Sequence, residues 1–300
     1  MHALDALRDA VSRHLSRSPD SGPCLTGIDG VVLMRAQAER HPTHLVHQPA
    51  ICMVLQGAKW TAFGEQRQEY RAGQARIVNV TVPGSSQVVE GDNHAPYLSL
   101  VVVFDQAILS EVYEKLAGVI TPCTGAPVPA FAIDLNAQLL DCARRIVDLL
   151  DQPLAADILF PGLMRELCYL LLSGPRGDVL AGQIVSTQRN QKLMQVLQAL
   201  RVRYAQSQSL EALADMAGMS ISAFHRSFKA LTGMTPLDYQ KKVRLMEARR
   251  LMITERVSAE ATAYAVGYAS ASQFSRDYAR MFGLPPRQDI NKLTGISQHV

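Results

Sequence analysis

Histidine and cysteine are the residue types in this sequence that could bind a metal ion or carry redox chemistry. Three histidines lie close together at His41, His44 and His47, and His94 follows further along the chain. Imidazole is a common ligand of transition metals, so this group raises a metal site as one interpretation. Two prolines interrupt the segment HPTHLVHQP, however, and we therefore expect exposed loop histidines and no bound metal.

The cysteines are scattered along the chain without a Cys-x-x-Cys pair. An odd and unpaired set of this kind argues against a disulfide framework and against a thiolate zinc site. We expect buried or incidental thiols, and nothing in the sequence points to a redox-sensing pair. The residues are Cys24, Cys52, Cys123, Cys142 and Cys168.

The elements that must position any functional group change in type along the chain. Residues 49–105 predict strands, because β-branched segments such as RIVNVTV and YLSLVVVF alternate with turn residues, among them Gly57 and the pair Pro83–Gly84. Several short strands of this kind favour a small barrel or sandwich. The single tryptophan, Trp60, is expected in its core. The longest apolar runs fall well short of the ~20 residues that a membrane span needs.

Helical spacing replaces the strand pattern from residue 107 to about residue 174. Apolar residues recur there one helical turn apart, and Gly174–Pro175 ends the last of these helices. The helices, those within 136–172 above all, can pack on the strands or on a second subunit. The residues with helical spacing are Leu139, Leu140, Ala143, Ile146, Val147 and Leu150.

The two halves of the chain differ in charge. Glycine and proline punctuate the segment between them, so we place a first domain at 1–175, a linker at 176–186 and a second domain at 187–300. Residues 1–187 carry 14 Lys+Arg and 19 Asp+Glu, a net charge of −5, whereas residues 188–300 carry 16 and 8, a net charge of +8. This asymmetry indicates that only the second half meets a polyanion. The N-terminal segment lacks the continuous apolar stretch of a signal peptide, so we expect a cytoplasmic protein.

The basic half contains an internal repeat. The segment SLEALADMAGMSISAFHRSFKALTGMTP matches SAEATAYAVGYASASQFSRDYARMFGLPP, with one residue inserted in the second copy. Each copy has the landmarks of a helix-turn-helix, namely a serine N-cap, a small residue at the helix crossing, and a glycine, Gly218 or Gly267, in a left-handed turn. The paired landmarks are Ser209/Ser258, Ala214/Ala263, Gly218/Gly267, Phe224/Phe274, Arg226/Arg276, Phe228/Tyr278, Gly233/Gly283 and Pro236/Pro286.

The second helix of each copy is predicted to have one buried and one polar face. Phe224 and Phe228 point inward at i, i+4 spacing, and Phe274 and Tyr278 repeat them. The opposite face then carries polar residues able to meet base edges in the major groove. Residues 236–253 predict a connecting helix, which would hold the two units about 34 Å apart if they enter successive grooves.

This pattern resembles a family of bacterial regulators. Residues 188–290 are similar to the DNA-binding domain of the AraC/XylS family, and the first half is similar, less specifically, to a cupin-like regulatory domain of that family. The resemblance implies an α+β fold with a cupin-like β-barrel and accessory helices, followed by an all-α domain with two helix-turn-helix units joined by a linker helix. It is carried by Ala214, Gly218-Met219-Ser220, Phe224-His225-Arg226-Ser227-Phe228-Lys229, Gly233-Met234-Thr235-Pro236, Gln273-Phe274-Ser275-Arg276, and the first-half segments HQPAICMVLQGAKW and YRAGQ.

The resemblance also implies which residues face the DNA bases. They are Ser222, His225 and Arg226 in the first copy, and Ser272, Gln273 and Arg276 in the second. Arginine can pair with guanine and glutamine with adenine through two hydrogen bonds. For Arg226 and Arg276 a phosphate contact and a local ion pair remain open alternatives, and we expect His225 at the surface or near a phosphate. Phosphate neighbours or a solvated face are the expectation for Lys229, Lys241 and Lys242.

The second copy departs from the family in two places. The family usually has a lysine after the aromatic residue of the second helix, where this chain has Ala279, and Asp277 directly precedes Tyr278. The first helix reads ATAYAV where branched aliphatic residues are usual. We therefore expect weaker phosphate contact and a smaller core in this unit, and a smaller contribution to DNA affinity.

The cupin-like half leaves an enzyme as an alternative, in the form of a cupin-type metal-dependent enzyme fused to a DNA-binding domain. A cupin metal site needs two close histidines with a carboxylate on one strand and a later histidine. The place of the later histidine holds Ser85, Ser86 and Gln87, so we expect neither a metal nor a cofactor. An architectural protein without sequence preference is a second alternative, which the acidic half disfavours.

We predict a sequence-specific DNA-binding transcription regulator rather than an enzyme. The resemblance favours activation through RNA polymerase over simple repression. The expected partners are double-stranded promoter DNA, RNA polymerase, a small-molecule effector bound by the first domain and a second copy of the chain, with no membrane.

Overall fold

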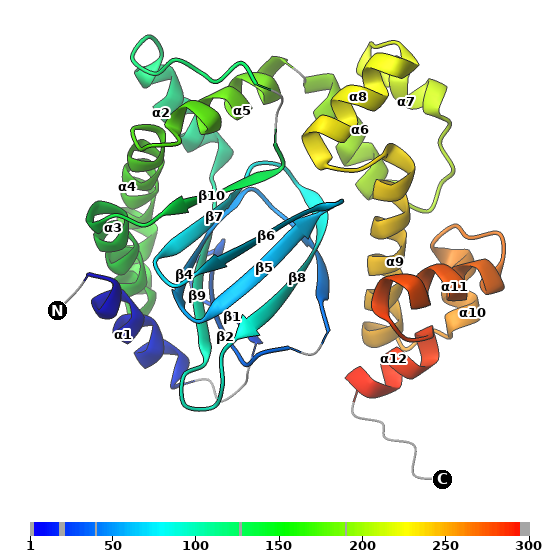
Figure 1. Ribbon diagram of the computed structural model, residues 1–300, viewed down its shortest axis with the longest axis horizontal. Coiled ribbons are helices and arrows are strands. Elements are labelled where there is room, and N and C mark those ends of the chain that lie inside the picture. The colour runs from blue at the N-terminus through cyan, green and yellow to red at the C-terminus, as the bar shows by residue number, and fades with distance from the viewer. Residues whose placement is uncertain (1–2, 18–21, 40, 126–127, 190, 295–300) are drawn as a thin grey trace. The chain divides into compact units, whose positions relative to one another are not determined.

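A computed structural model describes residues 3–17, 22–39, 41–125, 128–189 and 191–294. The chain divides into two compact units, residues 1–43 with 47–189 and residues 44–46 with 190–300. Figure 1 shows sheets and helices in the first unit, and helices α6 to α12 in the second. An α+β chain with a sheet-rich first half and a helical second half is therefore confirmed.

Two β-sheets form the centre of the first unit. The larger sheet has the order β1-β2-β9-β4-β7-β10, and the smaller has the order β3-β8-β5-β6. These sheets do not close into a barrel, so the expected cupin-like barrel is replaced by two facing sheets. The strands are β1 Gly22–Leu25, β2 Val31–Ala36, β3 Thr43–His47, β4 Ala50–Gln56, β5 Ala58–Phe63, β6 Gln66–Arg71, β7 Gln74–Val78, β8 Val82–Glu90, β9 Tyr97–Val103 and β10 Ala130–Asp134.

The larger sheet is covered by helices on one face and by the smaller sheet on the other. Ile51, Leu100 and Val102 share a hydrophobic core with helices α1, α3 and α4, which lie together beside the sheet in Figure 1. On the other face, Val54 and Tyr97 meet side chains of the smaller sheet. The helices of this unit are α1 Ala3–Leu15, α2 Gln106–Leu116, α3 Ala137–Asp148, α4 Pro153–Leu172 and α5 Gly177–Arg189, with a 3-10 turn at Leu149–Asp151.

Two local predictions for the strand segments are wrong. Pro83 and Gly84 lie within β8 rather than in a turn, and a Cβ atom on Gly84 would lie 2.5 Å from Cε1 of Phe63. The glycine therefore serves close packing across the sheets. His44 and His47 lie on strand β3 instead of in an exposed loop, and the His47 ring meets Phe63 edge-on with 5.0 Å between centroids.

Helix α5 occupies most of the segment that we expected to be an irregular linker. Leu180 and Ala181 are buried in the core of the first unit. The backbone N–H of Cys123 donates to the carbonyl of Asp178 at 2.9 Å, and a Cβ on Gly182 would lie 2.6 Å from the carbonyl oxygen of Cys123. The segment is thus a packed helix, because its apolar residues have a core to enter, while the domain boundaries themselves stay a prediction.

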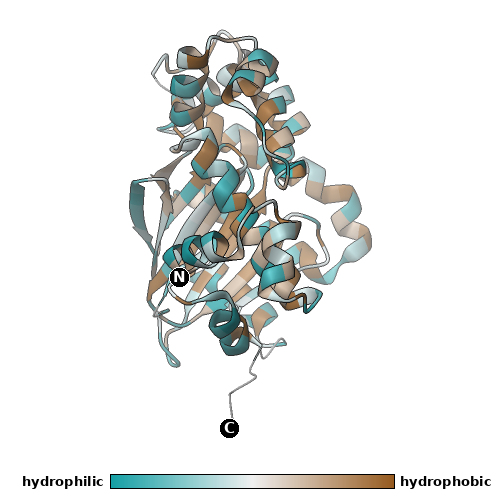
Figure 2. Cartoon of the chain, turned by 90° about the vertical axis from the view of Figure 1, so that its right-hand side faces the viewer, coloured by the Kyte–Doolittle hydropathy of each residue, from teal (hydrophilic) through white to brown (hydrophobic). Residues whose placement is uncertain are grey.

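The second unit consists of helices in the described residues. They are α6 Gln191–Val202, α7 Leu210–Ala217, α8 Ile221–Thr232, α9 Pro236–Thr254, α10 Ala259–Ala265, α11 Ala271–Phe282 and α12 Pro286–Leu293. Figure 2 shows hydrophobic and hydrophilic colours alternating around these helices, as expected of short amphipathic helices that share small cores. Helices α8 and α11 each pack against α9, which runs between them in Figure 1.

Candidate functional site

The first helix-turn-helix is shaped by local hydrogen bonds. Ser209 caps α7 and Ser220 caps α8, because each side chain accepts a hydrogen bond from the backbone N–H three residues later. Between the helices Gly218 has a φ of +66°, and the N–H of Met219 donates to the carbonyl of Ala214 at 3.0 Å. A left-handed residue with this long backward bond ends a helix sharply, so α8 leaves the turn in a fixed direction.

The second helix-turn-helix repeats this construction with one added constraint. Ser258 caps α10 and Ser270 caps α11. Gly267 has a φ of +86°, and a Cβ atom at this position would lie only 2.0 Å from the carbonyl oxygen of Ala205. Gly267 therefore serves both the turn and a close approach to the segment that follows α6.

One face of each second helix is anchored in a core. Phe224 and Phe228 are fully buried on α8, and Phe228 meets Tyr239 of α9 edge-on at 5.5 Å between centroids. Phe274 and Tyr278 are equally buried on α11. Burying the aromatic face against α9 turns the opposite face of each helix to solvent.

The opposite faces carry the residues that we expect to meet DNA. All except His225 are exposed, and His225 is half-buried. These exposed side chains supply hydroxyl, amide, ammonium and guanidinium groups, which can donate hydrogen bonds to bases and phosphates. Their assignment to DNA stays a prediction. The exposed residues are Ser222, Arg226 and Lys229 on α8, and Ser272, Gln273 and Arg276 on α11.

The two arginines have different surroundings. In the described part of the chain, neither Arg226 nor Arg276 forms an ion pair with a carboxylate. The Arg276 guanidinium instead donates to Oε1 of Gln273 at 2.7 Å, one turn earlier on α11. Arg226 is thus available to a ligand without losing such a bond, whereas Arg276 and Gln273 are joined before any DNA arrives.

Asp277, which set the second copy apart in the sequence, is directed inward. It is 5% exposed, and its carboxylate lies 3.5 Å from the Tyr268 hydroxyl, 3.9 Å from Lys241 Nζ and 3.8 Å from a guanidinium nitrogen of Arg280. Burial is also the main reason that the pKa of Tyr268 is raised, with Asp277 adding to it. This carboxylate therefore draws two surface cations toward itself and weakens the positive field beside α11.

Arg244 of α9 is a positioning residue that sequence reasoning did not identify. Its guanidinium donates to the carbonyls of Tyr204 at 2.6 Å, Ala205 at 3.3 Å and Gln206 at 3.2 Å, all in the segment after α6, and to that of Gly267 at 3.1 Å. This side chain thereby joins the segment between α6 and α7 to the turn of the second helix-turn-helix. Burial lowers the pKa of this guanidinium without discharging it. No sequence signal marks such a role, because its partners are backbone carbonyls.

A second unpredicted network holds α12. Asp289 accepts two hydrogen bonds from Arg249 of α9, both at 2.9 Å, and a third from the hydroxyl of Tyr278 at 2.7 Å. The Arg249 guanidinium also lies over the Phe282 ring at 4.5 Å. Three helices thus meet at one largely buried, bidentate ion pair, which fixes the end of α11.

Comparisons with known proteins agree with this architecture. Residues 27–179 match the family model of the AraC-type transcriptional regulator N-terminus, and residues 213–292 match a helix-turn-helix domain. The first of these matches covers half of the chain. The chain belongs to the AraC-type transcriptional regulators.

Curated relatives of this AraC-type chain include two transcriptional activators. It is 29% identical over 168 residues to the HTH-type transcriptional activator RhaS of Escherichia fergusonii, across 55% of this chain and 59% of the relative. It is 30% identical over 152 residues to RhaS of Salmonella schwarzengrund, across 50% and 51%. The chain spans about half the length of these relatives.

Solved structures share the fold over most of the AraC-type chain. Fatty-acid-bound ToxT from Vibrio cholerae superposes with a TM-score of 0.59 at 9% identity, covering 90% of this chain and 98% of that one. The apo form of a ToxT variant from the same organism gives 0.58 at 10% identity with the same coverage. At this identity the likeness concerns the arrangement of sheets and helices alone.

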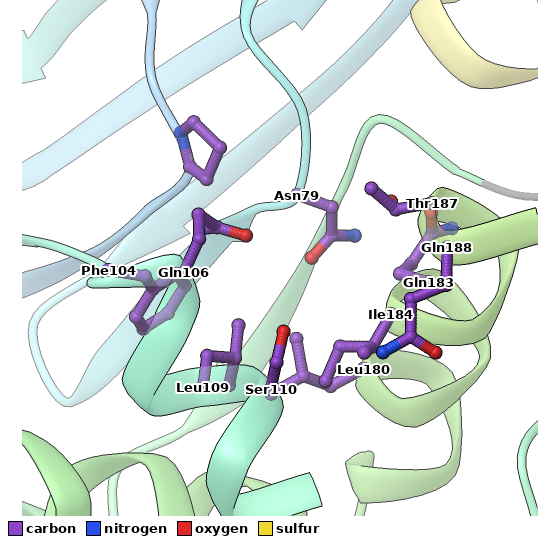
Figure 3. A pocket seen from close by; sticks show the side chains of 11 residues that line it. Asn79, Phe104, Gln106, Leu109, Ser110, Leu180, Gln183, Ile184, Thr187 and Gln188 are labelled. Atoms are coloured by element: carbon purple, nitrogen blue, oxygen red, sulfur yellow. The ribbon is translucent and has the colours of Figure 1, made fainter. Parts of the chain in front are cut away.

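The first unit contains a small cavity between strand ends and helices α2 and α5, shown in Figure 3. Its volume is about 50 Å³, and no ionisable side chain lines it. Asn79 and Gln183 contribute buried amide oxygens that lack a hydrogen-bond partner. One water needs about 10–15 Å³ of such space, so the cavity has room for a few ordered waters that can donate to the two amide oxygens.

Two further features bear on partners. Among the helices that the structure describes, none combines the length and hydropathy that a bilayer span requires. In the same residues, no three histidine, cysteine, aspartate or glutamate side chains lie close enough together to hold a metal ion, and the cluster His41, His44, His47 and His94 is not brought together as one site.

Proposed function

We propose that this chain is a sequence-specific DNA-binding transcription regulator, and that it activates transcription in response to a small molecule. The second unit would bind promoter DNA through α8 and α11. The first unit would bind the effector and a second copy of the chain, and contact with RNA polymerase would follow DNA binding. The named function of the curated relatives, transcriptional activation, supports the direction of the response.

The observation that carries this proposal is the pair of matched helices in one basic unit. Both α8 and α11 bury an aromatic face on α9 and expose a polar face, and both follow a glycine turn. The unit that holds them has the chain's excess of positive charge, +8 over residues 188–300. Two polar helices at fixed spacing suit two successive major grooves, and the charge excess suits the phosphate backbone.

Dimerisation would use the outer face of α4. Leu154 and Ile158, one turn apart, are 82% and 78% exposed, and Tyr169 of the same helix is 50% exposed. Large apolar side chains on a single helix face favour a partner surface over solvent. We therefore propose that the contact lies within residues 136–172, as the sequence leads us to expect.

Two single substitutions on α8 test sequence-specific binding. Arg226→Ala is expected to weaken binding to the true operator by about 1–3 kcal/mol, or roughly 5- to 150-fold, and to affect random DNA much less. Lys229→Ala, the matched control for a phosphate contact, is expected to weaken both about equally and to lower the slope of log affinity against log salt by about one. Fluorescence anisotropy with both duplexes over a salt series measures these effects.

The operator for this assay comes from mapping the DNA bound by the protein across its genome. An equal loss on operator and random duplexes for Arg226→Ala would reassign this side chain to the DNA backbone. Equal affinity of the unsubstituted protein for unrelated sequences at matched salt would replace the regulator with an architectural DNA-binding protein.

A further inference from the structure

Two cations are buried between the facing sheets of the first unit. Lys59 on β5 is 8% exposed and Arg76 on β7 is 3% exposed. The register of the strands places them on inner faces, because Lys59 pairs with Tyr70 and Val88 in the smaller sheet, and Arg76 pairs with Cys52 in the larger. Tyr70, Val88 and Cys52 all belong to the hydrophobic cluster that joins the two sheets.

Neither cation has a carboxylate partner within the described residues. Lys59 Nζ lies 4.0 Å from the Met34 sulfur and 6.0 Å from the centroid of the Tyr97 ring. Arg76 donates one hydrogen bond, to Oε1 of Gln68 at 3.3 Å, and its Nε lies buried without an acceptor. A buried charge is costly unless it is paired and hydrogen-bonded, so two such cations without an anion are an unusual arrangement.

Other polar atoms on the inner faces are also buried. The hydroxyl of Ser86 and Nε2 of His47 have no hydrogen bond among the described residues. The polar neighbours of the Tyr97 hydroxyl are Ser99 and the Cys52 thiol. Tyr97 and Ser99 are two residues apart on β9 and so lie on the same, inner face of the larger sheet. Ser86 lies opposite Thr61 on the inner face of the smaller sheet. Buried polar atoms are normally satisfied, so a group of unsatisfied ones points to an ion or ligand with acceptor atoms.

The buried phenols and the histidine beside the two cations carry no negative charge. Burial raises the pKa of both Tyr70 and Tyr97 well above the ordinary phenol value, so both stay protonated donors. Burial, then Lys59 and Arg76, lowers the pKa of His47 to about 3. The histidine is therefore neutral, and the field that it senses is positive.

We propose that the space between these sheets binds an organic carboxylate, with its carboxylate group held by Lys59 and Arg76. This assignment rests on the proposed function, since it names the chemical class of the effector. A planar carboxylate fits Arg76 because rings cover the guanidinium, with Phe63 at 5.1 Å and Tyr70 at 5.9 Å from centroid to Cζ, which leaves the in-plane N–H groups for an acceptor. The same rings supply apolar contact for the body of the ligand.

The test compares acids with their neutral isosteres on the full chain. Benzoate and hexanoate are titrated by calorimetry at pH 7.5, beside benzamide, hexanamide and inorganic phosphate. The acids are expected to bind and to raise the Tm, and the amides to bind at least tenfold more weakly. Amides that bind as well as the acids, phosphate that binds in their place, or acids that leave both the heat signal and the Tm unchanged would each overturn the carboxylate assignment.

Three variants locate the site. Lys59→Met and Arg76→Met are expected to lower the affinity for the acids at least tenfold, and Lys59→Met to keep or raise the Tm of the ligand-free protein, because it removes an unpaired buried charge. Lys115→Met, at an exposed lysine paired with Glu111 at 2.8 Å, is the matched control and is expected to bind the acids normally. Unchanged acid binding by both interior variants would refute the site.

This test separates the ligand from the regulator. Acid binding is measured without DNA, so a chain that binds acids but no specific operator would refute the proposed function alone. A chain that binds its operator but no acid would refute the carboxylate alone.

Discussion

Replacing Arg244 by methionine removes a side chain that joins the turn of the second helix-turn-helix to the segment after α6. Its four hydrogen bonds end on carbonyls of Tyr204, Ala205, Gln206 and Gly267. Methionine has a similar length and packs as an apolar chain, so the substitution removes the donors with little change in volume. The carbonyls of Ala205 and Gly267 then depend on water, whereas those of Tyr204 and Gln206 keep a hydrogen bond from Gln240 at 3.2 and 2.7 Å.

The expected cost follows from the number and kind of bonds. A hydrogen bond to a charged group contributes about 1.5–3 kcal/mol, but bonds from one guanidinium are not additive, and water can reach part of this half-buried site. We therefore expect the free energy of unfolding of the second unit to fall by about 3 kcal/mol. For a unit of about a hundred residues this corresponds to a decrease in Tm of roughly 14 °C.

The effect on DNA binding should depend on how many half-sites the duplex offers. We call the helix-turn-helix units at α7–α8 and α10–α11 the first and second heads. When they are held at fixed spacing, binding of the first half-site positions the second head on the other, and this gain in affinity is lost when the second head moves independently. We expect Arg244→Met to bind a duplex with both half-sites about 10- to 100-fold more weakly. Binding to a duplex with the second half-site scrambled should change less than threefold, as measured by anisotropy well below the Tm of the variant.

Arg250→Met is the matched control, because Arg250 lies on the same helix and is exposed in a pair with Glu247 at 2.6 Å. It is expected to change stability by less than about 1 kcal/mol and DNA binding hardly at all. An Arg244→Met protein with unchanged affinity for the double site would refute the positioning role. An equal loss on both duplexes would show that the substitution damages the first head instead.

Three further predictions concern separate features. In urea titrations, Gly267→Ala should lower the free energy of unfolding of the second unit at least twice as much as Gly283→Ala. Both glycines have a positive φ, but of the two only Gly267 faces a backbone atom, because its added Cβ would lie 2.0 Å from the carbonyl oxygen of Ala205. The free energy of unfolding of the first unit should fall as the pH drops from about 6.5 toward 3. Burial lowers the pKa of His47 to about 3, so the histidine of the unfolded chain takes up its proton at a higher pH than that of the folded chain. His47→Asn should flatten this pH dependence, and a variant with the same dependence as the parent protein would contradict the prediction. Ile158→Asp, at a 78% exposed position on α4, should turn a dimer into a monomer in sedimentation velocity, whereas a monomeric parent protein would rule out the contact.

The helix-turn-helix units could be predicted from sequence because their signals are local. A serine cap, a left-handed glycine and an aromatic pair at i, i+4 each act within one or two turns of helix. The capping bonds of Ser209 and Ser220 and the burial of Phe224 and Phe228 follow directly from such spacing. Repetition of the pattern in the chain makes the inference stronger still.

The remaining features depend on contacts between distant residues. Arg244 meets carbonyls some forty residues away, and Asp289 meets Arg249 across a similar separation. The pairing of sheets also decides that Gly84 lies in a strand, since its close neighbour is Phe63 on another strand. Nothing in the local sequence distinguishes Lys59 and Arg76 from surface cations, because their burial results from the way the two sheets face each other.

The two heads differ in how freely their proposed base readers can meet DNA. On α11 two of the three proposed base readers, Gln273 and Arg276, are bonded to each other, and Asp277 lies near Lys241 and Arg280. This bond holds both side chains in one orientation before DNA arrives, so a base contact that needs another orientation must break it, and DNA meets a weaker positive field beside α11. Arg226 on α8 has neither obstacle in the described structure, so the first head can engage bases without rearrangement. We expect specificity to be set mainly by the half-site under α8, with α11 adding affinity only where its half-site repays the broken bond.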